Sequence, residues 1–163
     1  MGFLKMKKII SYFLPVFIAG LLLASSCNKN NINPNIPNVV INFSIDPNST
    51  QFLGLNTVGG WIYLDEIPGI IVPYPSRGVI VYRYDLNEFK AYERQPPNEP
   101  FKCCDDAKGC TKLIVGDNYP FAKDTCTGSL YQLLDGILFS GEGQYSLIRY
   151  NANYDGAILH IYN

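Results

Sequence analysis

From Val39 onward the chain is divided into short apolar segments by Gly, Pro, Asn and Asp residues, about every eight to twelve positions. The segments are rich in Val, Ile, Phe and Tyr, which suit the pleated surface of a sheet, whereas the dividing residues favour turns. No window in this part of the chain keeps the periodicity of an amphipathic helix. The pattern therefore predicts an all-β domain, a small antiparallel sandwich or barrel.

The expected strands are the segments 39–45, 59–64, 79–84, 89–92, 113–115, 129–133, 145–150 and 157–162. The segment 79–84 is the strongest of them, because five of its residues are β-branched or aromatic. Residues 85–88 are expected to form a hairpin turn between two of these strands. Residues 153–156 are expected to form another, because the pair Asp155-Gly156 is a strong hairpin signal.

The N-terminal sequence has the layout of an export signal. Lys5, Lys7 and Lys8 precede an apolar stretch that ends in small residues directly before Cys27. This layout resembles a bacterial lipoprotein signal, which implies removal of residues 1–26 and lipidation of Cys27. The stretch is shorter than the roughly 20 apolar residues that span a bilayer comfortably, although an uncleaved anchor remains the alternative. We expect an exported protein of the cell envelope, tethered to a membrane through the lipid on Cys27 and facing the periplasm or the cell surface.

Residues 27–38 are polar and interrupted by proline, so we expect them to form a flexible tether without a buried face. The expected domain organisation is a signal peptide at 1–26, the tether at 27–38 and one β domain at 39–163. Within that domain, residues 91–134 are expected to form a loop subdomain that disulfides brace.

The charge and the histidine count exclude several classes of function. Thirteen basic residues and 14 acidic residues give a formal net charge of −1. Without a basic excess to neutralise phosphates, nucleic acid is not an expected partner. The single histidine, His160, excludes any site that one chain builds from two imidazoles. It lies in a predicted strand, where we expect it to occupy a sheet face rather than to act in catalysis.

Four cysteines lie in the predicted domain: Cys103, Cys104, Cys110 and Cys126. An even set in an exported protein is typical of disulfides. The vicinal pair Cys103 and Cys104 suits a mutual bridge poorly, because adjacent residues strain its geometry. Each is therefore expected to pair with Cys110 or Cys126, and both connectivities stay open. A four-thiolate zinc site is the alternative, but the closely spaced cysteine pairs that usually build one are missing.

Four segments together resemble the Rieske iron–sulfur family. They are 91–100 (AYERQPPNEP), 128–136 (GSLYQLLDG), 141–150 (GEGQYSLIRY) and 156–161 (GAILHI). The first is similar to the approach to the family's first ligand loop, the second to the segment after its second ligand loop, and the others to the loop and strands that close the fold. The order and spacing of these segments carry the resemblance, which covers nearly all of the predicted domain. The resemblance implies a Rieske-like fold.

The same resemblance implies that the cluster ligands are absent. The first-loop ligand positions fall on Pro96 and Asn98, and the second-loop positions fall on Asp124 and Thr127. A [2Fe–2S] centre of this family needs two thiolates and two imidazoles, which these four residues do not supply. We therefore expect no cofactor and no metal. A weak oxygen-ligand site at Asn98 and Asp124 is conceivable, but hard cations want six or more oxygens.

The resemblance also favours one disulfide pairing. Some family members carry a bridge between the two ligand loops, and Cys126 falls at one end of it. The implied partner is Cys103 or Cys104, which leaves the other cysteine of that pair for Cys110.

These observations predict a non-catalytic envelope protein, a structural or interaction module whose partner is an unidentified envelope protein. Two alternatives differ in class. A Rieske-type electron-transfer protein would need the missing ligands, and an enzyme would have only His160 and scattered acids. Of these acids, the neighbours Asp65-Glu66 and Asp105-Asp106 are expected in solvated turns, because adjacent strand residues face opposite ways.

Overall fold

The computed structural model describes residues 33–107 and 109–163 of the chain. Within them the regular structure consists of short β-strands and three short 3-10 segments, η1 (Thr50–Leu55), η2 (Leu64–Glu66) and η3 (Gly116–Asn118). The predicted all-β class is therefore confirmed. No helix in the described part of the chain is both long enough and apolar enough to cross a membrane. The predicted signal peptide and Cys27 lie outside the described residues.

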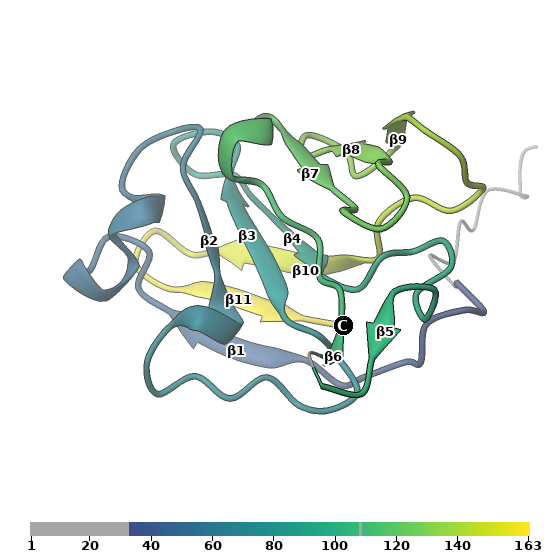
Figure 1. The fold of residues 1–163 in the computed structure, drawn as a ribbon. Helices are drawn as coiled ribbons and strands as arrows, with labels where there is room; N and C mark the ends of the chain where they lie inside the picture. The colour runs from purple at the N-terminus through teal and green to yellow at the C-terminus, as the bar shows by residue number, and fades with distance from the viewer. Residues whose placement is uncertain (1–32, 108) are drawn as a thin grey trace, which may run out of the picture. The chain divides into compact units, whose positions relative to one another are not determined.

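One antiparallel sheet contains six strands (Figure 1). From edge to edge these are β1 (Asn42–Ile45), β11 (Leu159–Tyr162), β10 (Arg149–Tyr154), β4 (Phe89–Glu93), β3 (Val79–Arg83) and β2 (Trp61–Tyr63). In Figure 1 the strands β1, β11 and β10 run at an angle to β2, β3 and β4, so the sheet curls along its width.

Two hairpins set the register of this sheet. The turn between β3 and β4 was predicted, whereas the turn between β10 and β11 lies at 155–158, two positions after the predicted 153–156. Between β3 and β4, the Tyr84 N–H donates to the Glu88 carbonyl at 2.8 Å and aligns Arg83 with Phe89. Between β10 and β11, the Asp155 carboxylate accepts the N–H groups of Ala157 and Ile158 at 2.9 and 2.7 Å. Side chains with this local bonding capacity stabilise tight turns, which explains why the sequence signals were reliable here.

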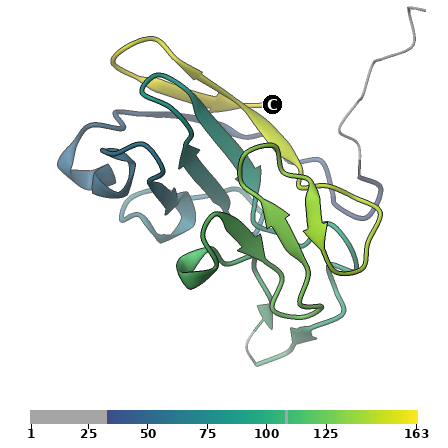
Figure 2. The same ribbon diagram turned by 90° about the horizontal axis from the view of Figure 1, so that it is seen from above.

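Two smaller sheets lie in the segment between β4 and β10 (Figure 2). Three strands form one of them in chain order, β7 (Phe121–Lys123), β8 (Leu130–Gln132) and β9 (Leu138–Ser140). The other is the hairpin of β5 (Cys104–Asp105) and β6 (Gly109–Cys110). The sequence patterns did not predict β5, β6, β7 or β9, because two or three residues are too few to show alternation.

The core consists of two apolar clusters. Successive residues of a strand point to opposite faces, so β3 contributes Val79 and Val81 to the first cluster and Ile80 and Tyr82 to the second. The first cluster also contains Ile41, Leu55, Leu64, Leu159 and Ile161. The second also contains Tyr92, Leu113, Val115, Ala122, Tyr131, Leu133 and Leu147. All five residues of β3 are buried, as expected for a central strand with packed layers on both faces.

Two predicted strands differ from the structure. Segment 113–115 forms only an isolated bridge between Ile114 and Lys123, because the N–H of Leu113 bonds instead to the Arg94 carbonyl at 2.8 Å. The segment 145–150 becomes a strand only at Arg149, because the N–H of Tyr145 bonds to a side chain. Its strand then continues through Tyr154, beyond the predicted end.

The described end of the predicted tether also differs from the expectation. Asn33 and Ile36 are buried, and the Asn33 side-chain amide donates to the Pro97 carbonyl at 2.7 Å. The prediction of a segment without a buried face is therefore wrong for these residues. Only one amide side chain and one isoleucine pack against the domain here. Such isolated contacts produce no amphipathic periodicity in the sequence.

Candidate functional site

Two disulfides connect the loops between β4 and β8. Cys103 bonds to Cys126 across a sequence separation of 23, and Cys104 bonds to Cys110 across a separation of 6. The predicted presence of disulfides is confirmed, and this is one of the two connectivities left open by the cysteine positions. The Cys103–Cys126 bond joins the loop after Pro96 to the loop after Asp124, so it holds the two candidate ligand loops against each other.

Asn98 organises the first of these loops. Its side chain is about nine-tenths buried, and its Oδ1 accepts the N–H groups of Gln144 and Tyr145 at 2.9 and 3.0 Å. Its Nδ2 donates to the Tyr131 hydroxyl at 2.9 Å and to the Tyr145 carbonyl at 3.0 Å. Both oxygen lone pairs and both N–H groups of the amide are thus used within the protein.

Asp124 organises the second loop in the same manner. Its carboxylate is buried and accepts the Cys126 N–H at 2.9 Å and the Thr127 hydroxyl at 2.7 Å. The Thr127 hydroxyl lies 2.9 Å from that of Ser129, which donates to the Glu142 carbonyl at 3.2 Å. These bonds close the turn between β7 and β8 and connect it to the 141–145 loop.

The buried hydroxyl of Tyr131 lies between the two loops. Burial raises the pKa of this phenol and the charge of Asp124 raises it further, whereas hydrogen bonds with Asn98 and Ser129 lower it. Gly143 has a φ of 152° and packs so closely on Asn98 that a Cβ there would clash with the amide. The 141–145 loop therefore covers the hydrogen-bonded groups of both candidate ligand loops.

Of the four positions assigned to cluster ligands, Asn98, Asp124 and Thr127 are joined in this way through Tyr131 and Ser129. Pro96 is also buried, at the start of the first loop, and has no side-chain donor or acceptor.

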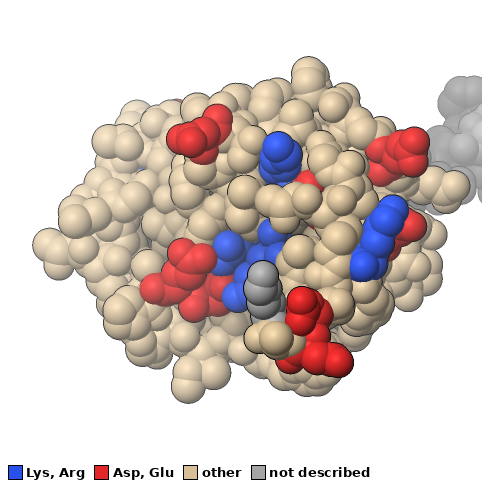
Figure 3. Space-filling view, viewed as in Figure 1, with Lys and Arg blue, Asp and Glu red and all other residues tan. Residues whose placement is uncertain are grey.

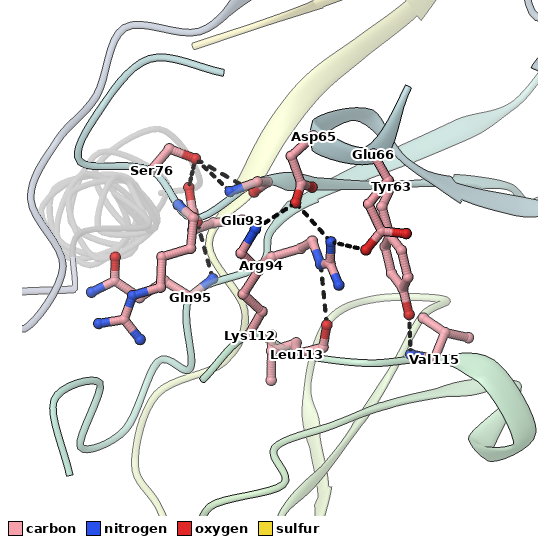
Figure 4. A network of polar contacts seen from close by, with 12 residues as sticks. Tyr63, Asp65, Glu66, Ser76, Glu93, Arg94, Gln95, Lys112, Leu113 and Val115 are labelled. Atoms are coloured by element: carbon pink, nitrogen blue, oxygen red, sulfur yellow. Dashed lines mark hydrogen bonds and ion pairs between the residues drawn. The ribbon is translucent and has the colours of Figure 1, made fainter. Parts of the chain in front are cut away.

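A second polar network lies under the start of the first loop (Figure 4). The Glu93 carboxylate is buried, and it accepts the Ser76 hydroxyl at 2.6 Å and the Tyr150 hydroxyl at 2.7 Å. It also accepts the backbone N–H groups of Arg77 and Gln95 at 2.9 and 3.0 Å. The carboxylate thus has four hydrogen-bond donors, and a buried charge requires such partners.

Arg94, the next residue, points to the other side of the strand. Its side chain is 4 % exposed, and its Nη1 lies 2.8 Å from Asp65 and 2.9 Å from Glu66. The guanidinium carbon lies 3.5 Å from the centre of the Tyr63 ring, and Nε donates to the Leu113 carbonyl at 3.2 Å. This arginine therefore connects β4, η2 and the segment before η3.

Asp105 and Asp106 are exposed as predicted, but only Asp106 lies in a turn, since Asp105 belongs to β5. The prediction of a solvated turn is wrong for Asp65. The Asp65 side chain is only 10 % exposed, and it also pairs with Lys112 at 2.7 Å. Asp65 and Glu66 both reach Arg94 because they lie in the 3-10 segment η2, where adjacent side chains do not alternate between two faces.

A hollow of about 740 Å³ adjoins this network. Its polar lining includes Asp65, Ser76, Arg77, Gln95 and Lys112. Its apolar lining includes Ile70, Ile71, Val72, Tyr74 and Phe101. Figure 3 shows Lys and Arg side chains gathered near the centre of the face viewed in Figure 1, with Asp and Glu side chains on both sides.

His160 lies apart from both networks. It is in β11 opposite Ser44, whose hydroxyl is 2.9 Å from its Nδ1, and its Nε2 lies 3.5 Å from Asp155. Among the described residues, no group of three or more His, Cys, Asp or Glu side chains is placed to hold a metal ion.

Comparisons with protein-family models, with curated proteins and with solved structures found no match to this chain.

The sequence analysis missed Glu93, Arg94 and Tyr131, which hold the two networks together. For Glu93 and Arg94 the sequence does contain a signal, namely two charged residues directly after the apolar strand residue Tyr92. Charged residues at such a position can be buried if they are paired. Their side-chain partners are 17 to 57 positions away in the sequence, so the pairing itself was not visible.

Proposed function

We propose that this protein is a non-catalytic, lipid-anchored module of the cell envelope, with a Rieske-like fold that has lost its iron–sulfur cluster. Its role is structural or consists of binding an envelope protein. The observation that carries the proposal is that the side chains in the two candidate ligand loops are used in hydrogen bonds within the protein, which connect the loops through Tyr131 and Ser129. Asn98 uses its whole amide, and Asp124 uses both carboxylate oxygens, to close the loops around Tyr131.

The residues present do not fit a [2Fe–2S] cluster. Such a centre needs two thiolates and two imidazoles. All four cysteines of the domain are in disulfides, so none of them offers a thiolate. His160 is in β11 beside Ser44 and does not contact either candidate ligand loop. A Rieske-type electron-transfer role, the second candidate, would need a ligand set that these side chains cannot form.

An enzymatic role has little support from the arrangement of the described residues. The buried carboxylate of Glu93 accepts four hydrogen bonds, and Arg94 is bound through Nε and Nη1 to a backbone carbonyl and two carboxylates. Groups held in this way stabilise the loops.

Spectroscopy of the native protein tests the loss of the cluster. The protein purified from envelopes under anaerobic conditions is expected to contain no iron, to show no visible absorption bands and to give no paramagnetic signal on reduction. A [2Fe–2S] signal in stoichiometric amount would overturn the proposal.

Rebuilding the ligands tests the assignment of the positions. In a variant that combines Pro96→Cys, Asn98→His, Asp124→Cys and Thr127→His, we expect iron and sulfide to reconstitute a [2Fe–2S] spectrum. The matched control replaces Asn98 and Thr127 by Gln instead and should remain colourless. A variant that folds with both native disulfides intact, yet takes up no cluster, would contradict the assigned positions.

The lipid anchor and the partner are tested in cells. Mass spectrometry of the mature N-terminus should find a lipid on Cys27, and Cys27→Ser should release the protein from the membrane fraction. Crosslinking in intact envelopes should then capture a stable protein partner with the anchored chain. A soluble native chain with an unmodified Cys27 would contradict the anchor.

A further inference from the structure

The hairpin formed by β5 and β6 carries a disulfide that solvent can reach. Cys104 and Cys110 lie directly opposite each other in its register. Cys104 is exposed and Cys110 is half-buried. The hairpin has only two residues in each strand, and its four strand residues include no buried one. Access of a thiol to the sulfur atoms is one of the conditions for disulfide exchange, and this bond meets it.

Arg77 lies next to one of the two sulfur atoms. Its Nη2 is 3.9 Å from the Cys104 Sγ, and its Nη1 donates to the Thr111 carbonyl at 2.9 Å. The guanidinium carbon is 5.5 Å from the centre of the Phe101 ring, so an aromatic face also helps to fix its position. This places a fixed positive charge beside Cys104.

That charge has no carboxylate partner within the described residues, where no acidic oxygen lies within 4.0 Å of the guanidinium. Burial lowers the pKa of Arg77, while the more distant carboxylates of Glu93 and Asp124 raise it. An arginine remains protonated at neutral pH in spite of such shifts. A thiolate that forms on Cys104 would be stabilised by this cation, and a stabilised thiolate is a better leaving group.

The hollow next to the network gives a route to the second sulfur. Cys110 lines it together with Arg77, Lys112 and the apolar side chains of Tyr74 and Phe101. A second hollow of about 440 Å³ is lined by both Cys104 and Cys110. The two sulfurs are therefore distinguished by the guanidinium beside Cys104, which favours Cys104 as the departing sulfur.

We propose that the Cys104–Cys110 disulfide is a thiol–disulfide exchange site that oxidises thiols in the envelope. A thiolate attacks the Cys110 Sγ, the Cys104–Cys110 bond breaks, and its electron pair remains on the Cys104 Sγ beside Arg77. The product is a mixed disulfide between the thiol and Cys110. A second thiolate then attacks the substrate sulfur of this mixed disulfide and releases Cys110 as a thiolate. Two thiols become one disulfide, and their two protons end on Cys104 and Cys110.

This site does not depend on the proposed loss of the cluster. Iron content reports on the loops at Asn98 and Asp124, whereas exchange reports on the β5–β6 hairpin. Finding a cluster would therefore not contradict the exchange site, and finding no exchange would not contradict the loss of the cluster.

The first test uses the full native chain and 2-mercaptoethanol, a small thiol that carries no charge besides that of its thiolate. After timed exposure at neutral pH, free thiols are alkylated and the peptides that contain each cysteine are quantified by mass spectrometry. We expect Cys104–Cys110 to be reduced about tenfold faster than Cys103–Cys126, because Arg77 makes Cys104 a favoured leaving group. Exposure does not separate the two bonds, since Cys103 is exposed and Cys126 half-buried, as Cys104 and Cys110 are. Equal rates, or faster reduction of Cys103–Cys126, would overturn the proposal.

The second test examines Arg77. The variant Arg77→Gln should slow reduction of Cys104–Cys110 by about threefold, as expected if the pKa of the departing thiol rises by roughly one unit. Arg77→Lys should recover part of the rate. The matched control is Lys102→Gln, which also removes one positive charge but one that pairs with Glu99 and contacts no sulfur. If Arg77→Gln and Lys102→Gln change the rate equally, the assigned role of Arg77 is wrong.

A third measurement separates a direct effect on the thiolate from a general loosening of the hairpin. In Cys110→Ser, the pH dependence of alkylation reports the pKa of Cys104. Adding Arg77→Gln should raise that pKa, and adding Lys102→Gln should leave it unchanged. An unchanged pKa in the Arg77 variant would contradict stabilisation of the Cys104 thiolate.

Discussion

The two apolar clusters lie on opposite faces of β3 and β4 and are stabilised in different ways. The first cluster is enclosed by ladders of up to five residue pairs and by hairpins with favourable turn residues. The second is covered by strands of three residues, by loops, and by the connection from Leu113 to Leu147. The strands and loops that cover the second cluster are stabilised by side-chain hydrogen bonds and by a disulfide. Strands of three residues form too few backbone hydrogen bonds to stabilise this layer alone.

The difference shows what the loops need in order to stay ordered. Where strands are long, burial of apolar surface and backbone pairing fix the structure together. Where strands are short, Asn98, Asp124 and Tyr131 take over the role of backbone partners, and Cys103–Cys126 limits the freedom of the unfolded chain. Changes in the first cluster should therefore affect the whole domain, while changes around the loops should have a more local effect.

The largest effect is expected from a cavity in the first cluster. Leu159 is fully buried in β11, so Leu159→Ala should lower the free energy of unfolding by about 2–5 kcal/mol. Urea denaturation followed by the fluorescence of Trp61 measures this change. The matched control is Leu86→Ala in the β3–β4 turn, where the leucine is 67 % exposed and the loss should be below about 0.5 kcal/mol. Similar losses in the two variants would contradict the assignment of the core.

Removal of the loop disulfide should come next. The chain-entropy model assigns about 3 kcal/mol to a loop of the Cys103–Cys126 length and about 2 kcal/mol to one of the Cys104–Cys110 length. We expect Cys103→Ala/Cys126→Ala to lose more stability in urea than Cys104→Ala/Cys110→Ala. Hydrogen exchange should locate the effect in residues 121–140, with β3 and β4 still protected. Faster hydrogen exchange throughout β3 and β4 would mean that the layer over the second cluster does not open independently of the main sheet.

The sequence predicted the first region better than the second, for a physical reason. Segments 79–84 and 89–92 with the turn 85–88 contain their own alternation and turn residues, and the structure has β3 and β4 there. The strands β7 and β9 have only three residues each, so they show no clear alternation, although both pair with β8, their neighbour in the chain. Among the site residues, the disulfides were predicted from the cysteine count, but the pairing of Arg94 with Asp65 spans 29 positions and was not. The resemblance to the Rieske family stays a prediction.

A smaller effect is expected at Asn98. Asn98→Ala leaves the N–H groups of Gln144 and Tyr145 and the Tyr131 hydroxyl without their partner, which should cost about 2 kcal/mol. Urea denaturation measures the loss, and hydrogen exchange should show that the 141–145 loop opens. Asn151→Ala, at an exposed position of β10, is the matched control and should change stability little. Intact protection of the 141–145 loop in Asn98→Ala would contradict the role assigned to Asn98.

The smallest effect at neutral pH is expected for Tyr150→Phe, which removes one of the four donors to Glu93. The loss should be about 1 kcal/mol. The variant is most informative at alkaline pH, because burial and the charge of Glu93 raise the pKa of Tyr150 above its ordinary value of 10.0. Burial also raises the pKa of Tyr92.

Below pH 10 both the folded and the unfolded chain keep these phenols protonated, so the shift has no effect on stability. Above that pH the unfolded chain releases the protons while the folded chain retains them, and the free energy of unfolding should therefore fall as pH rises toward the folded-state pKa. Tyr150→Phe removes one such group, so its stability should fall less steeply above pH 10 than that of the native chain. The comparison variant is Tyr162→Phe, at the exposed last residue of β11. Equal slopes for Tyr150→Phe and the native chain would show that burial in the first cluster and the contact with Glu93 do not hold the phenol of Tyr150 in its protonated form.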